Sequence, residues 1–157
     1  MSQTPVAETA LSAVVTLVAL PNGAGDYWYD FSASGAVRIG IPDPSQAGPV
    51  PCVYVWPGEM GIAPSAEMGS WDQKLMIQVW ARVPSLTSDP ADRAKAGLRA
   101  LNDLLLALRS NRSLSSAVLD APASGSVWVG ADFGLDGIEG CTLTLNPWWL
   151  ALPTEGA

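Results

Sequence analysis

Histidine is absent from the 157-residue chain. Its absence removes the commonest general base of enzymes, the Ser-His-Asp and Cys-His arrangements of hydrolases, and most metal sites. The two glycine-rich phosphate-binding patterns, G-x-x-x-x-G-K-[ST] and G-x-G-x-x-G, do not occur either. No pattern of residues therefore points to catalysis. We expect a protein that is not an enzyme and that uses no cofactor and no metal.

Basic residues are scarce, with 8 Lys and Arg against 15 Asp and Glu, for a formal net charge of -7. This balance counts against non-specific nucleic-acid binding and against docking on an anionic membrane. The charges are also segregated, because no Lys or Arg follows Arg112 while residues 120–157 carry only acidic groups. Copies with separated charges could pair head to tail. The alternative is a solvated basic helix surface, since exposed ion pairs contribute little.

Cysteine and long hydrophobic runs are also rare. Cys52 and Cys141 lie inside separate hydrophobic stretches, where two small buried thiols are more common than a disulfide. The apolar run over 10–20 is too short to span a bilayer, and no Lys or Arg precedes it. The sequence therefore predicts no membrane segment and a reducing, cytoplasmic setting.

The clearest structural signal is a strand followed by a helix. Residues 71–83 alternate with a period of two, which predicts a strand buried on one face. Asp89 and Pro90 then provide a helix cap and a first helical residue, and Asp92 places negative charge in the first turn. The predicted buried positions are Leu75, Ile77, Val79, Ala81 and Val83 on the strand, and Ala94, Leu98, Leu101, Leu105 and Leu108 on the helix.

The rest of the chain predicts one more helix and several short strands. The helix is expected over 5–20, with Ala7, Leu11, Val14 and Val18 on one face, although its β-branched residues leave a buried strand open. Further strands are expected at 37–41, 52–56, 127–131 and 140–146. This order predicts an α+β fold with a mainly antiparallel four- to five-stranded sheet and two helices packed on one face.

We expect a single domain over 1–157. Its ordered core is predicted over about 5–150, with a flexible loop over about 57–70 and a short C-terminal tail. The loop is predicted because Pro57 and Gly58 follow the strand at 52–56 and are expected to end it.

Seven tryptophans are the remaining unusual feature. Most are expected in the core, but Trp80 lies on the polar side of the strand at 71–83, and Trp148 and Trp149 are adjacent. Aromatic and Arg residues on a surface are typical interface anchors. The alternative is that a helix or loop covers this second face of the sheet. The candidate interface residues are Arg38, Trp80, Arg82, Arg93, Arg99, Trp148 and Trp149.

Several phrases of the sequence resemble the tail terminator and tail-completion proteins of long-tailed bacteriophages, which are minor tail and neck proteins. The phrases are P-C-V-Y-V-W at 51–56, V-W-A-R at 79–82, D-P-A-D-R-A-K-A-G-L-R-A-L at 89–101 and N-R-S-L at 111–114. Together with the order of the predicted elements, the resemblance spans roughly 6–150.

The resemblance implies a subunit that forms a ring, usually a hexamer, on the head-proximal end of the tail tube. Such a ring ends tube polymerisation and provides the surface for head–tail joining. The implied partners are copies of the chain itself, the tail tube protein and a head-closure or connector protein. DNA only passes through the lumen, and no membrane is involved. The implied location is the virion, and the host cytoplasm during assembly.

Other functions remain open. Another neck component, a head-closure or adaptor protein, would have a similar size. A tail-tube subunit would need long hairpin strands, whereas the sequence predicts only short ones. From a different class, a small ligand-binding domain could use an aromatic pocket built from Tyr27, Trp28 and Tyr29.

Overall fold

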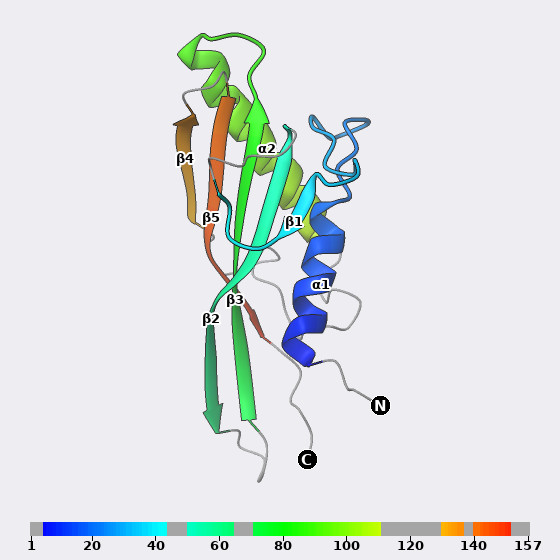
Figure 1. Ribbon diagram of the computed structural model, residues 1–157, viewed down its shortest axis with the longest axis vertical. Coiled ribbons are helices and arrows are strands. Elements are labelled where there is room, and N and C mark those ends of the chain that lie inside the picture. The colour runs from blue at the N-terminus through cyan, green and yellow to red at the C-terminus, as the bar shows by residue number, and fades with distance from the viewer. Residues whose placement is uncertain (1–4, 44–49, 65–70, 111–129, 137–139, 152–157) are drawn as a thin grey trace.

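The computed structural model describes residues 5–43, 50–64, 71–110, 130–136 and 140–151. These residues form two helices and five strands (Figure 1). In chain order the elements are α1 (Val6–Val18), β1 (Val37–Ile39), β2 (Cys52–Pro64), β3 (Trp71–Pro84), α2 (Pro90–Arg109), β4 (Gly130–Asp136) and β5 (Gly140–Ala151).

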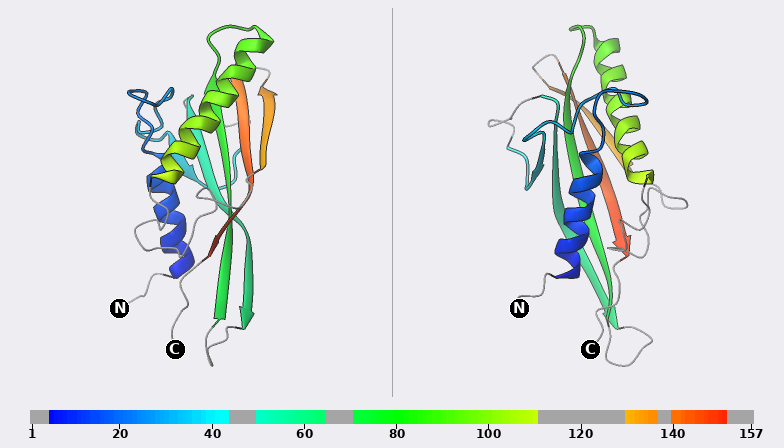
Figure 2. Two further views of the ribbon diagram at one scale, coloured as in Figure 1. Left: turned by 180° about the vertical axis from the view of Figure 1, so that it is seen from behind. Right: turned by 90° about the vertical axis from the view of Figure 1, so that its right-hand side faces the viewer.

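The five strands form one sheet in the order β1-β2-β3-β5-β4. β1 runs parallel to β2, and the other three pairings are antiparallel. Both helices lie on the same face of this sheet, and no helix of the described residues covers the opposite face, here called the helix-free face (Figure 2). The fold is therefore α+β, as expected, with a mixed sheet.

The alternation of the central strand β3 is confirmed. Each of the five residues predicted to face the core is buried, with at most 4% of its surface exposed. They join β2 and both helices in one core, because each helix contributes an apolar stripe to the same side of the sheet. The intervening residues of β3 therefore point to the helix-free face.

The N-terminal segment is the helix α1 rather than a buried strand. It begins after Pro5, which suits a helix start because its fixed φ angle is compatible with the first turn and it has no N–H to satisfy. Its buried residues are Ala10, Val14, Leu17 and Val18. Val14 and Val18 were predicted to be buried, whereas Ala7 and Leu11 are half-buried at the edge of the core.

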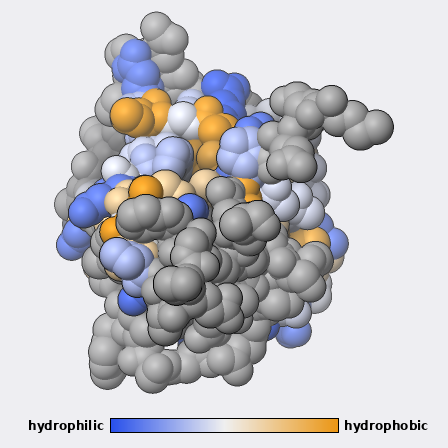
Figure 3. Space-filling view, turned by 90° about the horizontal axis from the view of Figure 1, so that it is seen from below, coloured by the Kyte–Doolittle hydropathy of each residue, from blue (hydrophilic) through white to orange (hydrophobic). Residues whose placement is uncertain are grey.

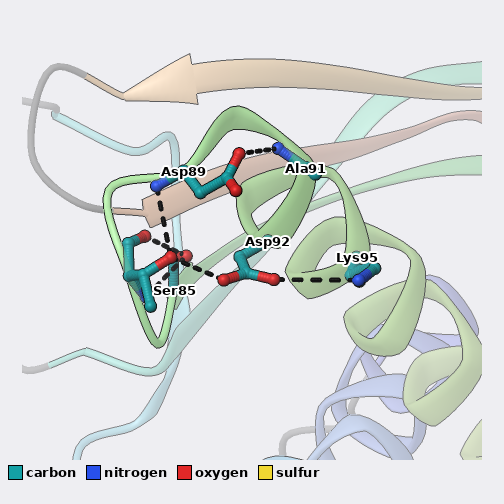
Figure 4. Close-up of polar contacts among 6 residues, drawn as sticks. Ser85, Asp89, Ala91, Asp92 and Lys95 are labelled. Atoms are coloured by element: carbon teal, nitrogen blue, oxygen red, sulfur yellow. Dashed lines mark hydrogen bonds and ion pairs between the residues drawn. The ribbon is translucent and has the colours of Figure 1, made fainter.

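The predicted start of α2 is confirmed in detail. An oxygen of the Asp89 side chain accepts a hydrogen bond of 3.0 Å from the backbone N–H of Ala91 (Figure 4). The Asp92 carboxylate accepts a second hydrogen bond from the hydroxyl of Thr87 and lies 3.8 Å from the amino group of Lys95. Negative charge in this turn is favourable because the N-terminus of a helix carries a partial positive charge.

Replacing Asp89 by alanine should lower the free energy of unfolding by about 1 kcal/mol, the usual contribution of such a cap. Asp89→Asn should remain close to the wild type, because its amide oxygen still accepts the Ala91 hydrogen bond. Urea titration of both variants tests the cap. Equal losses for alanine and asparagine would show that the hydrogen bond does not stabilise the helix.

The predicted buried face of α2 is wrong by a rotation about the helix axis. Ala94 and Leu98 are exposed, Leu101 and Leu105 are half-buried, and Leu108 is buried as predicted. Leucines follow one another on all sides of this helix, so their spacing does not define one face. The buried face of α2 is instead rich in small residues, which allow the helix to approach the sheet closely. The buried residues are Ala96, Gly97, Ala100, Asp103, Leu104, Ala107 and Leu108.

The strand β2 does not end at Pro57 and Gly58 as predicted. The pairing of β2 with β3 shifts register between Pro57 and Glu59 and then continues to Pro64. Pro and Gly are tolerated in strands at such bulges, and a Cβ atom at Gly58 would lie only 2.6 Å from the terminal methyl of Met76. The predicted loop is therefore strand over 57–64, and its remainder, 65–70, lies outside the described residues.

The other strands also differ from the prediction in their bounds. β1 stops at Ile39, β4 extends to Asp136, and β5 continues through Pro147 to Ala151. The predicted strand residues 127–129 and the predicted tail after Ala151 lie outside the described residues.

Candidate functional site

One row of residues crosses the helix-free face of the sheet from edge to edge. The register pairs Arg38 of β1 with Tyr54, Tyr54 with Trp80, Trp80 with Thr144 of β5, and Thr144 with Asp132 of β4. Residues paired across neighbouring strands share a face. The row therefore begins with a cation at one edge of the sheet and ends with a carboxylate at the other.

Aromatic contacts hold the first half of this row together. The rings of Tyr54 and Trp80 meet edge to face, with centroids 5.6 Å apart, a favoured geometry for aromatic pairs. The guanidinium carbon of Arg38 lies 5.9 Å from the centroid of the Tyr54 ring. Arg38 also donates to the backbone oxygen of Gly35 at 3.1 Å and to the Tyr54 hydroxyl at 3.4 Å. The cation is therefore oriented by its own strand neighbours.

Arg82 lies on the same face but contributes little surface, because only 7% of it is exposed. It is paired in the sheet with Cys52, whose thiol is also buried. Burial raises the pKa of Cys52, and the nearby guanidinium groups of Arg82 and Arg38 act in the opposite direction. This cysteine is therefore held as the neutral thiol, which is a poor nucleophile.

The far ends of β2 and β3 form an arm, defined as residues 57–64 and 71–76, which is two-stranded only at its tip because β5 pairs with β3 as far as Lys74. The arm projects beyond the N-terminal end of α1 (Figures 1 and 2). All residues of its β2 half are exposed, including the apolar Met60 and Ile62, the latter at 59%. Viewed from this end, hydrophobic residues reach the surface between hydrophilic ones (Figure 3).

A second candidate site is a cavity of about 330 Å³ on the helix side of the molecule. It is lined by Trp28, Tyr29, Pro84, Ser85, Leu86 and Arg99. The guanidinium carbon of Arg99 lies 4.2 Å from the centroid of the Trp28 ring, a cation–π contact. Trp28 is nevertheless 57% exposed, so the aromatic surface remains accessible.

The buried carboxylate of Asp103 holds this aromatic loop against α2. It accepts hydrogen bonds from the backbone N–H of Trp28, at 2.9 Å in the shorter of two contacts, and from that of Tyr29 at 2.8 Å. Burial raises the pKa of Asp103, while these two backbone hydrogen bonds act to lower it. Asp103 is not among the residues that the sequence predicted as functional. The one clue in the sequence was its position on α2, three residues after Ala100 and four before Ala107, which places the acidic residue on the same helix face as these two small residues.

The structure distributes the predicted interface residues over several places. Arg38, Trp80 and Arg82 share the helix-free face, whereas Arg99 lies beside the cavity. Arg93 donates two hydrogen bonds to the backbone oxygen of Ser88, at 3.2 and 2.7 Å, and so stabilises the turn before α2. Sequence reasoning missed Tyr54 and Asp132, which appear as site residues only when the register of the sheet is known.

The two adjacent tryptophans lie on β5, where Trp148 pairs with Ile77 and Trp149 with Met76. Their side chains lie outside the described part of the structure, as does that of Cys141.

No group of three or more His, Cys, Asp or Glu side chains in the described part of the chain could hold a metal ion. None of the described helices combines the length and the apolar character needed to cross a bilayer. Asp30 accepts hydrogen bonds from the backbone N–H and the hydroxyl of Ser32, which lower the pKa of this exposed carboxyl. It therefore stabilises a local turn.

The chain was compared with known proteins. No protein-family profile matches it, and no curated protein sequence does. A solved structure titled "Virion of native gene transfer agent (GTA) particle" contains a chain with 14% sequence identity and a TM-score of 0.45. The match covers 96% of this chain and 98% of that one.

Proposed function

We propose that the chain is a structural assembly protein of a phage-like particle. In this proposal it forms a ring on the head-proximal end of the tail tube, ends tube polymerisation and provides the head–tail joining surface. The sequence resemblance to tail terminators supplies the position in the particle. The proposed partners are copies of the chain, the tube protein and a head-closure or connector protein.

The observation that carries an assembly role is the projecting arm. At the tip of the arm, Ile62–Pro64 pairs with Trp71–Gln73 without a third strand from the described residues, and a two-stranded hairpin is marginally stable in water by itself. The arm also leaves Met60 and Ile62 exposed to solvent. Contact with another subunit would cover these side chains and hold the two strands in place. On the helix-free face Tyr54 is only 8% exposed and supports Trp80 from beside it. The half-buried Trp80 supplies an aromatic surface of the kind that is typical of interfaces.

The test is the mass of the purified chain in solution, measured by mass photometry over a concentration series, together with negative-stain images. Rings with a central hole would support the proposal. Stacked filaments would favour a tail-tube subunit, because the long β2–β3 hairpin removes the objection that the chain has only short hairpins. A head-closure or adaptor protein would also form rings, so binding of the rings to the ends of tail tubes distinguishes the terminator.

A ligand-binding domain remains the second candidate because of the cavity beside Trp28, whose volume is within the range of small-molecule sites. A monomer whose tryptophan fluorescence changes on addition of small molecules would favour it. Loss of that change in Trp28→Ala would locate the ligand at the cavity.

Replacing Trp80 by alanine should weaken self-association more than it weakens folding. Trp80 is half-buried in the middle of the helix-free face, and tryptophans at interfaces commonly contribute about 2 kcal/mol or more, roughly a thirtyfold change in the dissociation constant. Mass photometry measures the first effect and urea titration the second. Trp28→Ala, at an aromatic residue away from this face, is the matched control. Equal losses of association and stability for Trp80→Ala would identify Trp80 as a core residue.

A further inference from the structure

We infer that β4 of one copy lies beside β1 of the next, with Asp132 paired to Arg38, so that the sheet continues from subunit to subunit. This inference rests on the proposed ring and names the contact that would build it. It starts from the two edges of the sheet, which β1 and β4 form on opposite sides of the molecule (Figure 1).

Both edges are open among the described residues. In β1, the oxygen of Ala36 and the N–H of Gly40 bond to β2. Backbone groups alternate sides along a strand, so those of Val37 and Ile39 point away from β2. β4 likewise pairs with β5 alone within the described sheet. Such edges are ready to pair with another chain.

The strand directions allow the pairing. β1 is parallel to β2, and each of the remaining steps through β3, β5 and β4 reverses direction. β4 therefore runs opposite to β1, and a copy placed beside the first would add an antiparallel pair to the sheet. Because the contact joins two different edges, it is heterologous and generates a ring when the rotation between copies closes.

The side chains at the two edges are complementary on the helix-free face. Arg38 and Asp132 belong to the same row of paired residues, so extending that row into the next copy brings the guanidinium of one to the carboxylate of the other. Neither has an oppositely charged partner among the described residues. The Arg38 bonds to Gly35 and Tyr54 leave further N–H groups available.

The side chains on the helix side are complementary as well. In the same register Val37 lies opposite Phe133, and Ile39 lies opposite Ala131. Ile39 is 59% exposed and Phe133 is 46% exposed, so each edge presents one large apolar residue to solvent. An edge-to-edge contact would cover both, and such burial is the main favourable term in association.

Charge reversal tests the contact. Arg38→Asp gives a chain with two acidic edges, and Asp132→Arg gives one with two basic edges. Each variant alone should need at least a tenfold higher concentration than the wild type to assemble, because like charges would face one another. An equimolar mixture of the two should assemble again, with the variants alternating around the ring. Mass photometry follows assembly, and circular dichroism confirms that both variants are folded.

The matched controls make the same charge changes away from both edges. Lys95→Asp on α2 and Glu8→Arg on α1 alter exposed residues and should leave assembly unchanged. The edge contact is wrong if the wild type forms rings and each edge variant assembles at the same concentration as the wild type. It is also wrong if both variants are folded but their mixture does not assemble. Neither result would contradict the ring itself. A wild-type chain that remains monomeric at all concentrations would contradict both the ring and its contact.

Discussion

Replacing Leu104 by alanine should lower the free energy of unfolding by about 2–5 kcal/mol, the range for a large-to-small change in a core. Leu104 is fully buried in the middle of α2, where it joins the core shared by both helices and the sheet. Removing its side chain loses apolar burial and leaves a cavity that the rigid sheet cannot close completely. Urea titration with a constant slope measures the loss.

Leu98→Ala is the matched control for Leu104→Ala. It makes the same chemical change on the same helix, but Leu98 is largely exposed, so the free energy of unfolding should change by no more than about 0.5 kcal/mol. If Leu98→Ala costs as much as Leu104→Ala, the rotation of α2 described above is wrong.

The second large effect is expected at Asp103. Asp103→Ala removes the acceptor of the Trp28 and Tyr29 backbone hydrogen bonds and should lower the free energy of unfolding by about 1.5–3 kcal/mol, as for hydrogen bonds to charged groups. The Trp28 ring should then lose its cation–π contact with Arg99, and the tryptophan emission spectrum should shift. Asp26→Ala, at an exposed carboxylate of the same loop, should change neither quantity. An unaltered emission spectrum in Asp103→Ala would show that the loop is held by other contacts.

The pH dependence at Asp103 has a definite sign. Because burial raises its pKa in the folded state, the folded chain binds this proton more tightly than the unfolded chain. The stabilising contribution of this protonation is fully present below the unfolded pKa and is lost as the pH rises through the folded pKa. Measured against Asp103→Asn, which does not titrate there, the relative stability of the wild type should therefore decrease over this pH interval. A relative stability that increases with pH would contradict the raised pKa.

The sequence predicted some elements well because one physical signal dominated each of them. The alternation in β3 has a single interpretation, since one strand face is wholly apolar. The start of α2 combines a cap, a proline and a first-turn carboxylate. The buried face of α2 was missed because leucines occur all around the helix, and the small residues Ala96, Ala100 and Ala107 mark the close approach to the sheet.

The arm and the edge-to-edge row could not be predicted for different reasons. Pro57 and Gly58 commonly end a strand, and only the pairing with β3 shows that they form a bulge in a strand that continues. Arg38 and Asp132 are far apart in the sequence, and their alignment depends on four successive strand registers. A register that differed by one residue at any step would place one of them on the helix side.

The position of β3 in the middle of the sheet has a consequence for synthesis on the ribosome. β2 precedes β3 directly, but its other neighbour, β5, is translated only after α2 and β4. Until the last strand leaves the ribosome, the apolar central strand has one bare edge, and bare edges in incomplete chains favour aggregation. Truncations that remove Gly140–Ala151 should therefore yield insoluble protein, even though they keep every residue of both helices and of β1 to β4.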